Sequence, residues 1–159
     1  MYACRLRDAG ASASEIAKAL DEKKKSVRVL ALLDTLEYLK RGGRISKTAA
    51  LAGNLLSIKP VIAIVDGEVA VLGKARGSKN GCNMLREEIS KCNGIDFSMP
   101  ICLGYTGLDD SLLQKYIKDN TDLWKSYVEE LPISSIGSTI GTHTGPGGIC
   151  VAFFSKTNS

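Results

Sequence analysis

The chain has 159 residues, 44% of them hydrophobic and 24% charged, with a formal net charge of +4, which suits one domain with a buried core. This composition excludes a membrane-spanning helix, because no run approaches the roughly 20 apolar residues that a span needs, and charged residues interrupt the first twenty positions, where a signal peptide would show. The basic residues are scattered apart from Lys23 to Lys25 and Lys40-Arg41, so we expect no nucleic-acid interface.

The five cysteines are odd in number, and no two of them form a Cys-x-x-Cys pair. This argues against a disulfide framework and against a zinc site, so we expect no bound metal. A reducing, cytoplasmic location fits best.

The first predicted elements are a helix and a strand. Ser12 followed by Glu15 is typical of a capping box, and Ile16 and Leu20 then fall on one helical face. The mostly apolar run over residues 27–33 indicates a buried strand.

A second capping pattern, Asp34 followed by Glu37, predicts a short helix that ends at Gly42-Gly43. Ser46 can cap a further helix over residues 47–51. Arg44 therefore lies between a glycine break and a helix N-terminus, where backbone N–H groups and a guanidinium can meet one anion. An equally good interpretation is that Arg44 caps the preceding helix or pairs with a surface acid.

Residues 61–65 and 68–72 predict an antiparallel hairpin, because Asp66-Gly67 between them is a two-residue turn signal. The basic stretch over residues 74–79 then leaves the hairpin, and its charge is typical of a solvated surface.

In the second half of the chain, predicted helices again alternate with predicted strands. Ser78 or Asn80 begins a helix that runs to about Lys91, with an ion pair between Glu87 and Lys91. A short apolar strand follows over residues 101–103. Asp109 then caps a further helix.

An edge strand containing Pro132 is expected over residues 128–133, and a final apolar strand over residues 149–154. Ser134 or Ser135 opens a short helix between them. Helices that alternate with strands, one strand pair being a plain hairpin, predict a mixed α/β or α+β fold, a two-layer sandwich with a mixed sheet.

The stretch from Gly141 to Gly148 holds the chain's one histidine, His143, among four glycines and a proline. Glycine lets a ligand or another backbone come close, and histidine can donate, accept or carry charge near neutral pH. The plainer interpretation, which spacing alone favours, is a tight turn whose histidine satisfies backbone groups.

Three stretches taken together resemble the DegV family of bacterial fatty-acid-binding proteins. They are Leu36 to Ser46 (LEYLKRGGRIS), Ile58-Lys59-Pro60 with Asp66-Gly67 and Gly73 to Gly77 (GKARG), and Ile140 to Gly147 (IGTHTGPG). The resemblance covers nearly the whole chain.

DegV-like proteins are about twice this long, and the chain is similar to their C-terminal half. The resemblance implies a helix and strand leading in from an absent N-terminal domain over residues 1–34. A DegV-like C-terminal domain then covers residues 35–155, and a polar tail covers residues 156–159. The absent domain carries hydroxyl-rich loops that help to hold the fatty-acid carboxylate.

The resemblance implies binding rather than catalysis: no cofactor, and a long-chain fatty acid as ligand. An ATP-dependent fatty acid kinase subunit phosphorylates the carboxylate of that ligand. His143, with Thr142 and Gly145 of the same motif, is the implied head-group contact, and Arg44 is the next candidate. Arg76 and Lys74 are candidates for docking the kinase.

Two other hypotheses remain. One is a small enzyme that acts on an anionic substrate at the His143 turn, although the chain offers few catalytic constellations. The other is an interaction module that forms a homodimer through the apolar surface left by the absent domain.

Overall fold

The computed structural model describes residues 1–45, 57–127 and 130–157. The strands are β1 Val27–Leu32, β2 Ile58–Val65, β3 Glu68–Arg76, β4 Cys102–Tyr105, β5 Ile133–Ser135 and β6 Ile149–Phe154. The helices are α1 Tyr2–Asp8, α2 Ala13–Lys23, α3 Glu37–Arg41, α5 Gly77–Lys91, α6 Ser111–Asp119, α7 Thr121–Trp124 and α8 Ser138–Thr144, with a 3-10 turn, η1, over Lys24–Ser26.

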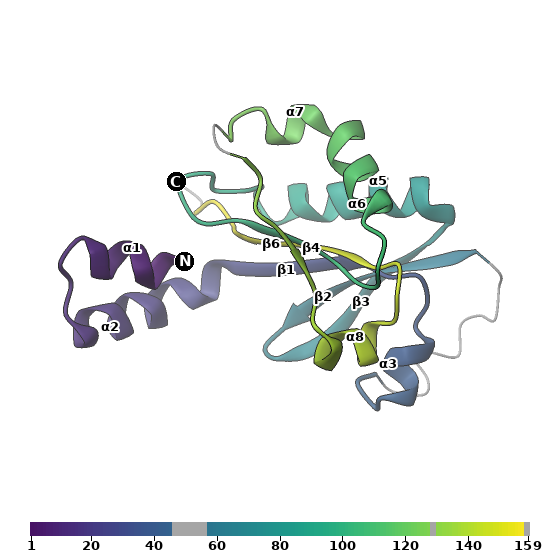
Figure 1. The fold of residues 1–159 in the computed structure, drawn as a ribbon, viewed down its shortest axis with the longest axis horizontal. Coiled ribbons are helices and arrows are strands. Elements are labelled where there is room, and N and C mark those ends of the chain that lie inside the picture. The colour runs from purple at the N-terminus through teal and green to yellow at the C-terminus, as the bar shows by residue number, and fades with distance from the viewer. Residues whose placement is uncertain (46–56, 128–129, 158–159) are drawn as a thin grey trace.

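The six strands form one mixed sheet in the order β3-β2-β1-β6-β4-β5, in which only β4 and β5 pair in parallel (Figure 1). The mixed α/β fold expected from the sequence is therefore confirmed. Strand β1 belongs to the predicted lead-in segment 1–34, yet it lies between β2 and β6 at the centre of this sheet. The division into lead-in, domain and tail stays a prediction.

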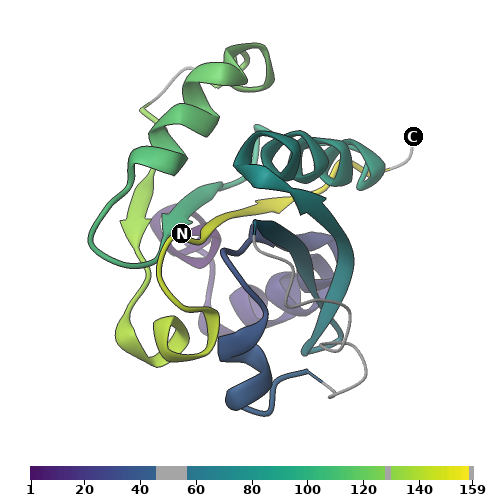
Figure 2. The ribbon, with the colours of Figure 1, turned by 90° about the vertical axis from the view of Figure 1, so that its right-hand side faces the viewer.

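Helix α5 lies across one face of the sheet and contacts β1, β2 and β3, and α6 and α7 complete the same layer (Figure 2). The main core forms between these helices and the sheet, where the covered side chains are almost fully buried. Its largest members are Tyr116, Phe153, Leu30, Leu32, Leu85, Ile89, Ile101, Leu103, Leu113 and Ile149.

Among the described residues, α3 and α8 lie on the opposite face at one end of the sheet and contact each other (Figure 2). Helices α1 and α2 form an arm that projects beyond the start of β1 (Figure 1). The arm is held to the body by the ring of Tyr2 against Phe154, with centroids 6.0 Å apart, and by a 2.9 Å hydrogen bond from Arg5 Nη1 to the carbonyl of Ser98.

Local signals set several of these elements. Ser12 and Glu15 form the expected capping box at the start of α2. Asp66 (φ 51°) and Gly67 (φ 84°) are both left-handed, as a two-residue turn between β2 and β3 requires. Strand β6 has the bounds that its apolar run predicted.

Other boundaries differ from the prediction. Helix α3 begins at Glu37, and Asp34 does not cap it but forms an ion pair with Lys59. Strand β3 continues to Arg76, so residues 74–76 are strand rather than an exit from the hairpin. Lys91 pairs with Glu88 and not with Glu87. The helix predicted over residues 47–51, with its Ser46 cap, lies outside the described residues.

The segment before His143 is also shifted. Ser134 and Ser135 belong to β5, where they pair with Gly104 and Tyr105, so the following helix begins only at Ser138. Of the strand predicted over residues 128–133, residues 128 and 129 lie outside the described residues, and among 130–133 only Ile133 belongs to β5. His143 lies in the last turn of α8 rather than in a loop.

Candidate ligand site at one end of the sheet

Helices α3 and α8 lie at the end of the sheet where β1 and β4 end and β6 begins. Leu32 at the end of β1 pairs with Val61 and with Ile149 at the start of β6. Ile149 also pairs with Tyr105 at the end of β4, and Tyr105 with Ser135 of β5. The chain leaves β1 into α3 and enters β6 from α8, so the two segments that carry His143 and Arg44 meet at this end.

The ring of His143 lies against Gly42, just after the end of α3. A side-chain carbon at Gly42 would collide with Nδ1 of His143 and lie 2.9 Å from its Cε1. The Nδ1 atom is buried and has no hydrogen-bond partner among the described residues. The two helices are therefore in direct contact through the one histidine.

A second contact of the same kind joins the helices in the opposite direction. Gly145, at the end of α8, has a left-handed φ of 73°, and a side-chain carbon there would collide with the ring of Tyr38 from α3. Each helix thus places an aromatic or imidazole ring on a glycine of the other. Glycine at both positions is what allows this close approach.

Arg44 reaches the same place from the other side. Its backbone N–H donates to the carbonyl of Leu39 over 2.8 Å, and its Nη1 donates to the carbonyl of Gly42 over 3.0 Å. The guanidinium therefore caps the end of α3, which is one of the two interpretations that the sequence left open. The side chain is exposed, so its remaining N–H groups can still meet an anion.

An open groove of about 670 Å³ adjoins Arg44. It is lined by Gly43, Arg44, Ile45, Gly67, Glu68, Val69 and Val71. The groove brings the cationic side chain of Arg44 beside the acidic side chain of Glu68 and the apolar side chains of Val69 and Val71 on β3.

Thr142 precedes His143 in α8, and its side chain is turned to the helix backbone and to solvent. Its hydroxyl donates to the carbonyl of Ser138 over 2.8 Å, within α8, and the side chain is exposed. The structure therefore brings His143, Gly145 and Arg44 together around α3, with Thr142 on the outer side of α8.

Lys74 and Arg76 lie on the edge strand β3, at the same end of the sheet. Lys74 pairs in register with Pro60, and Arg76 with Ile58. Arg76 is exposed, and its carbonyl accepts a 2.9 Å hydrogen bond from Asn80 at the start of α5. In the sheet, β2 and β1 lie between β3, which carries Lys74 and Arg76, and β6, which follows α8 in the chain.

Two features of this site were not found from the sequence. Thr106 is buried, and its backbone carbonyl, backbone N–H and hydroxyl all bind the loop at Gly147 and Gly148. The ion pair between Lys59 and Asp34 joins β2 to the segment after β1. Lys59 belongs to a motif that marked the family resemblance, which is a usable signal, whereas nothing local distinguishes Thr106.

The sheet face that α3 and α8 leave uncovered is apolar. Along β6 the buried residues Ile149, Val151 and Phe153 face the core, and the partly exposed Cys150, Ala152 and Phe154 alternate with them. Register places small and apolar side chains of the other strands on the same side as these. We call this surface the open face: Val29, Ile64, Val69, Val71, Cys102, Cys150, Ala152 and Phe154. Ala31 and Ile62 lie on the same side of the sheet but are buried in a cluster with Leu33 and with Leu39 of α3.

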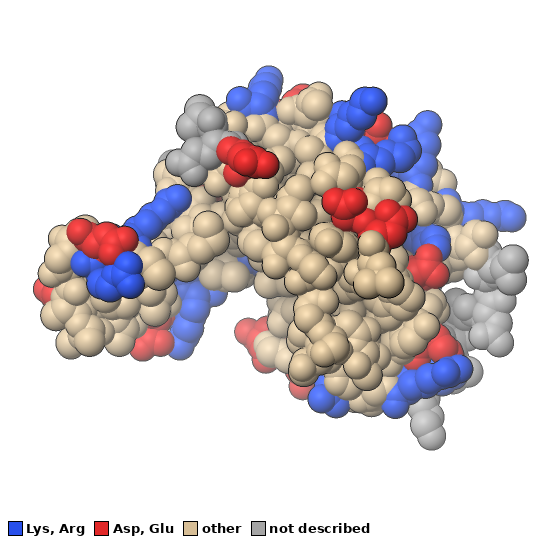
Figure 3. Space-filling model, viewed as in Figure 1, with Lys and Arg blue, Asp and Glu red and all other residues tan. Residues whose placement is uncertain are grey.

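Figure 3 shows the outline of the molecule indented between the α1–α2 arm and the region of α8, with charged side chains on the margins of the indentation. Burial raises the pKa of the Cys150 thiol on the open face to about 11, with a smaller contribution from the neighbouring thiol of Cys102. Cys150 therefore stays a neutral, weakly polar side chain at neutral pH.

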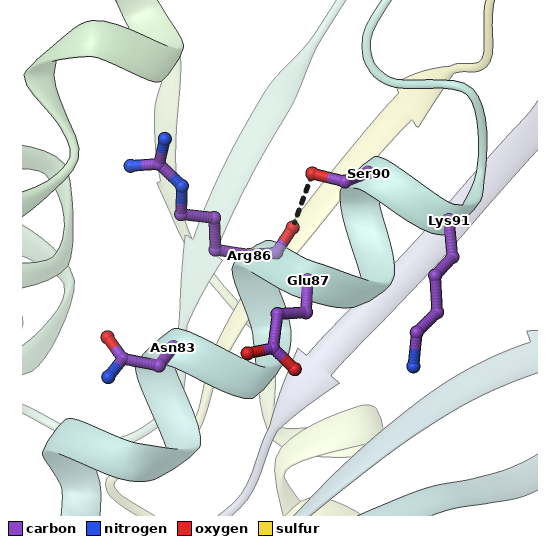
Figure 4. A pocket seen from close by; sticks show the side chains of 5 residues that line it. All are labelled: Asn83, Arg86, Glu87, Ser90 and Lys91. Atoms are coloured by element: carbon purple, nitrogen blue, oxygen red, sulfur yellow. Dashed lines mark hydrogen bonds between the residues drawn. The ribbon is translucent and has the colours of Figure 1, made fainter.

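A second surface hollow lies on the outer side of α5 and has a different character. Asn83, Arg86, Glu87, Ser90 and Lys91 line it, and the hydroxyl of Ser90 donates to the carbonyl of Arg86 over 3.2 Å (Figure 4). Arg86 is paired with Asp122 through two N–H groups, an arrangement that ties α5 to α7. These charged and polar side chains suit a solvated helix face rather than an apolar ligand.

No group of three or more His, Cys, Asp or Glu side chains in residues 1–45, 57–127 and 130–157 is placed to hold a metal ion. Among the same residues, none of the helices is both long enough and apolar enough to cross a bilayer.

The comparisons with known proteins agree with one another. A family model described as "Uncharacterised protein, DegV family" matches residues 1–156. A DegV domain-containing protein of Clostridium perfringens is 36% identical over 159 residues, which cover 98% of this chain and 53% of that protein.

Solved structures show the same fold. The Thermus thermophilus DegV family protein, described by its fatty acid binding, is 28% identical with a TM-score of 0.77 over 98% of this chain and 55% of its own. The Streptococcus pneumoniae Fatty Acid Kinase (Fak) B3 protein loaded with linoleic acid is 20% identical with a TM-score of 0.83, over 98% and 54%. The chain spans about half the length of the relatives that it matches.

Proposed function

The chain belongs to the DegV family, and on that premise we propose that it is the part of a fatty-acid carrier that holds the acyl tail and contributes to the carboxylate site. The observation that carries the proposal is the open face, which is apolar and ends at α3 and α8, where His143 and Arg44 are placed. Related structures described as fatty-acid binding support the same ligand class.

An acyl chain along the open face gains free energy mainly from its tail. Each buried methylene contributes about 0.8 kcal/mol, so a tail of about 16 carbons contributes on the order of 10 kcal/mol before ordering costs of several kcal/mol. The described open face covers one side of such a tail. A second surface is needed for the other side, either from a further domain or from a second copy of this chain.

The carboxylate sets a different requirement. A carboxylate next to apolar surface needs hydrogen-bond donors, either charged or neutral. Without them it takes up a proton instead. His143 rests on Gly42, Arg44 donates to the carbonyl of Gly42, and the groove beside Arg44 is lined by Val69 and Val71 of β3. The head group therefore belongs at α3 and α8, with the tail running away over the sheet.

The proposed role is presentation of this carboxylate to an ATP-dependent fatty acid kinase. A carboxylate oxygen forms a bond to the γ-phosphorus of ATP while the bond from that phosphorus to the ADP oxygen breaks, which gives an acyl phosphate and ADP. The neighbour described as a fatty acid kinase B3 protein supports this partner. Arg76, exposed at the end of β3, and Lys74 are the proposed contacts for the kinase.

The proposal is tested by organic extraction and mass spectrometry of the purified 159-residue chain, beside a longer DegV relative prepared in the same way. Fatty acid in both proteins places the main tail contacts on the open face. Fatty acid in the longer relative alone means that the tail needs the second surface as well. If neither protein retains or takes up added fatty acid, the proposal is wrong.

A further inference from the structure

Two consecutive glycines end α3, and they are there for different reasons. Gly43 has a left-handed φ of 67°, and nothing lies within 4 Å of the place where its side chain would be. Gly42 has an ordinary φ of −77°, which any residue adopts, but the space beside its Cα is filled by the ring of His143. Gly43 is required by backbone geometry, and Gly42 only by the ring that rests on it.

The ring contacts Gly42 with one edge. A side chain at Gly42 would meet Nδ1 and Cε1 of this ring and, at 3.1 Å, the backbone carbonyl oxygen of Tyr38. Nδ1 is buried with no acceptor or donor among the described residues. A buried N–H without an acceptor is rarer in proteins than an under-satisfied acceptor. The neutral ring therefore carries its proton on Nε2, which is the nitrogen left for a ligand.

We infer that Gly42 is a positioning residue for His143: it seats the ring with Nδ1 against α3 and leaves Nε2–H to face the ligand. The identity of the ligand as a fatty-acid carboxylate rests on the proposed function. The position and the tautomer of the ring are inferred independently of the proposed function.

A neutral donor suits a carboxylate that has to react. An imidazolium would hold the carboxylate by full charge and draw electron density from the oxygen that attacks phosphorus. An Nε2–H group orients the carboxylate while leaving more of its basicity. Gly42 therefore influences transfer through the geometry and protonation site of His143, without touching the ligand.

The test uses the fact that the chain has one histidine. In a ¹⁵N-labelled sample, long-range ¹H–¹⁵N spectra show a single imidazole, and the two nitrogens report which of them carries the proton in the neutral ring. We expect the Nε2–H tautomer in the wild type, and a shift of Nε2 larger than that of Nδ1 when palmitate is added.

The variants are Gly42→Ala and a matched control, Gly141→Ala. Gly141 lies two residues before His143, and nothing lies within 4 Å of the place where its side chain would be. The control is expected to keep the wild-type imidazole spectrum, and Gly42→Ala to lose the tautomer preference. A proton on Nδ1 in the wild type, or a wild-type spectrum in Gly42→Ala, would overturn the inference.

A double variant guards against simple misfolding. If the added methyl group acts only through the ring, Gly42→Ala combined with His143→Ala regains most of the midpoint temperature that Gly42→Ala alone loses. A double variant no more stable than Gly42→Ala contradicts the inference. Wild-type spectra that show the expected tautomer but no response to palmitate count against the proposed function and leave the seating of His143 intact.

Discussion

The ring of Tyr38 lies directly on Gly145, at the point where α8 ends and the loop into β6 begins. Gly145 is left-handed there, so two independent constraints, its φ and the ring, both exclude a side chain. The contact fixes where the loop starts and hence how α8 is placed above the sheet.

Gly145→Ala is therefore expected to be among the more damaging glycine changes in the chain. A left-handed alanine and a displaced tyrosine ring together cost about 1–3 kcal/mol of unfolding free energy. Urea denaturation followed by circular dichroism measures it, with Gly141→Ala as the control in the same helix. Equal stability of the two variants would contradict the proposed contact.

His143→Ala is expected to lower acyl phosphate formation more than fatty-acid affinity, because the tail supplies most of the binding free energy. Affinity for palmitate falls less than about tenfold, and the rate of transfer by a fatty acid kinase falls by a larger factor. Thr144→Ala, which removes a hydrogen bond to the carbonyl of Ile140 within α8, is the control. A large loss of affinity with a normal transfer rate would show that the assignment is wrong.

The ion pair between Lys59 and Asp34 is uneven, since the lysine side chain is 19% exposed and the aspartate side chain 53%. Asp34→Ala leaves a largely buried ammonium group without its carboxylate and costs about 1–2 kcal/mol. Lys59→Met leaves a carboxylate that water can still reach, so it costs less. Denaturant midpoints of the two variants decide the order, and the reverse order would refute this account.

Thr106 holds the loop before β6 through a 2.8 Å hydrogen bond that its hydroxyl accepts from the N–H of Gly148. Thr106→Val keeps the shape but leaves that buried N–H unsatisfied, at a cost of about 1–3 kcal/mol. Thr106→Ser retains the hydroxyl and serves as the control. Amide hydrogen exchange at Gly148 should become faster in the valine variant only.

Stability should fall on the alkaline side. Burial raises the pKa of the Cys150 thiol from 9.0 to about 11, so above pH 9 the unfolded chain loses this proton while the folded chain keeps it. The free energy of unfolding then decreases by about 1 kcal/mol per pH unit between pH 9 and 11 from this residue. Burial also raises the pKa of Tyr116, which adds to the loss.

Denaturation at pH 8 and at pH 10.5 tests this dependence, with Cys150→Ala as the comparison. The alanine variant should lose less stability over that interval than the wild type. Parallel curves would mean that Cys150 does not contribute.

Short-range patterns predicted the parts of the fold that local chemistry decides. The Ser12 capping box, the Asp66-Gly67 turn and the apolar run of β6 each form as their residues indicate. The Pro132 region was misplaced, because pairing of Ser134 and Ser135 with β4 overrides their preference for a helix start.

The sequence predicted only part of the candidate site. Glycine-rich surroundings marked His143 and Arg44 as unusual, and the family resemblance gave them a role. Their meeting at Gly42 joins segments about a hundred residues apart, and no periodicity reports such a contact. Thr106 and Asp34 act through partners that are 42 and 25 residues away in sequence, which is why they were missed.

The central position of β1 has a consequence for how the protein is made. β1 pairs along its whole length with β6, from Val27 opposite Phe154 to Leu32 opposite Ile149. While the chain is being synthesised, the backbone N–H and C=O groups along one edge of β1 therefore stay unpaired until residues 149–154 have left the ribosome. A ribosome that stalls before residue 149 releases a sheet whose innermost strand has become an edge, ready to pair with another stalled chain.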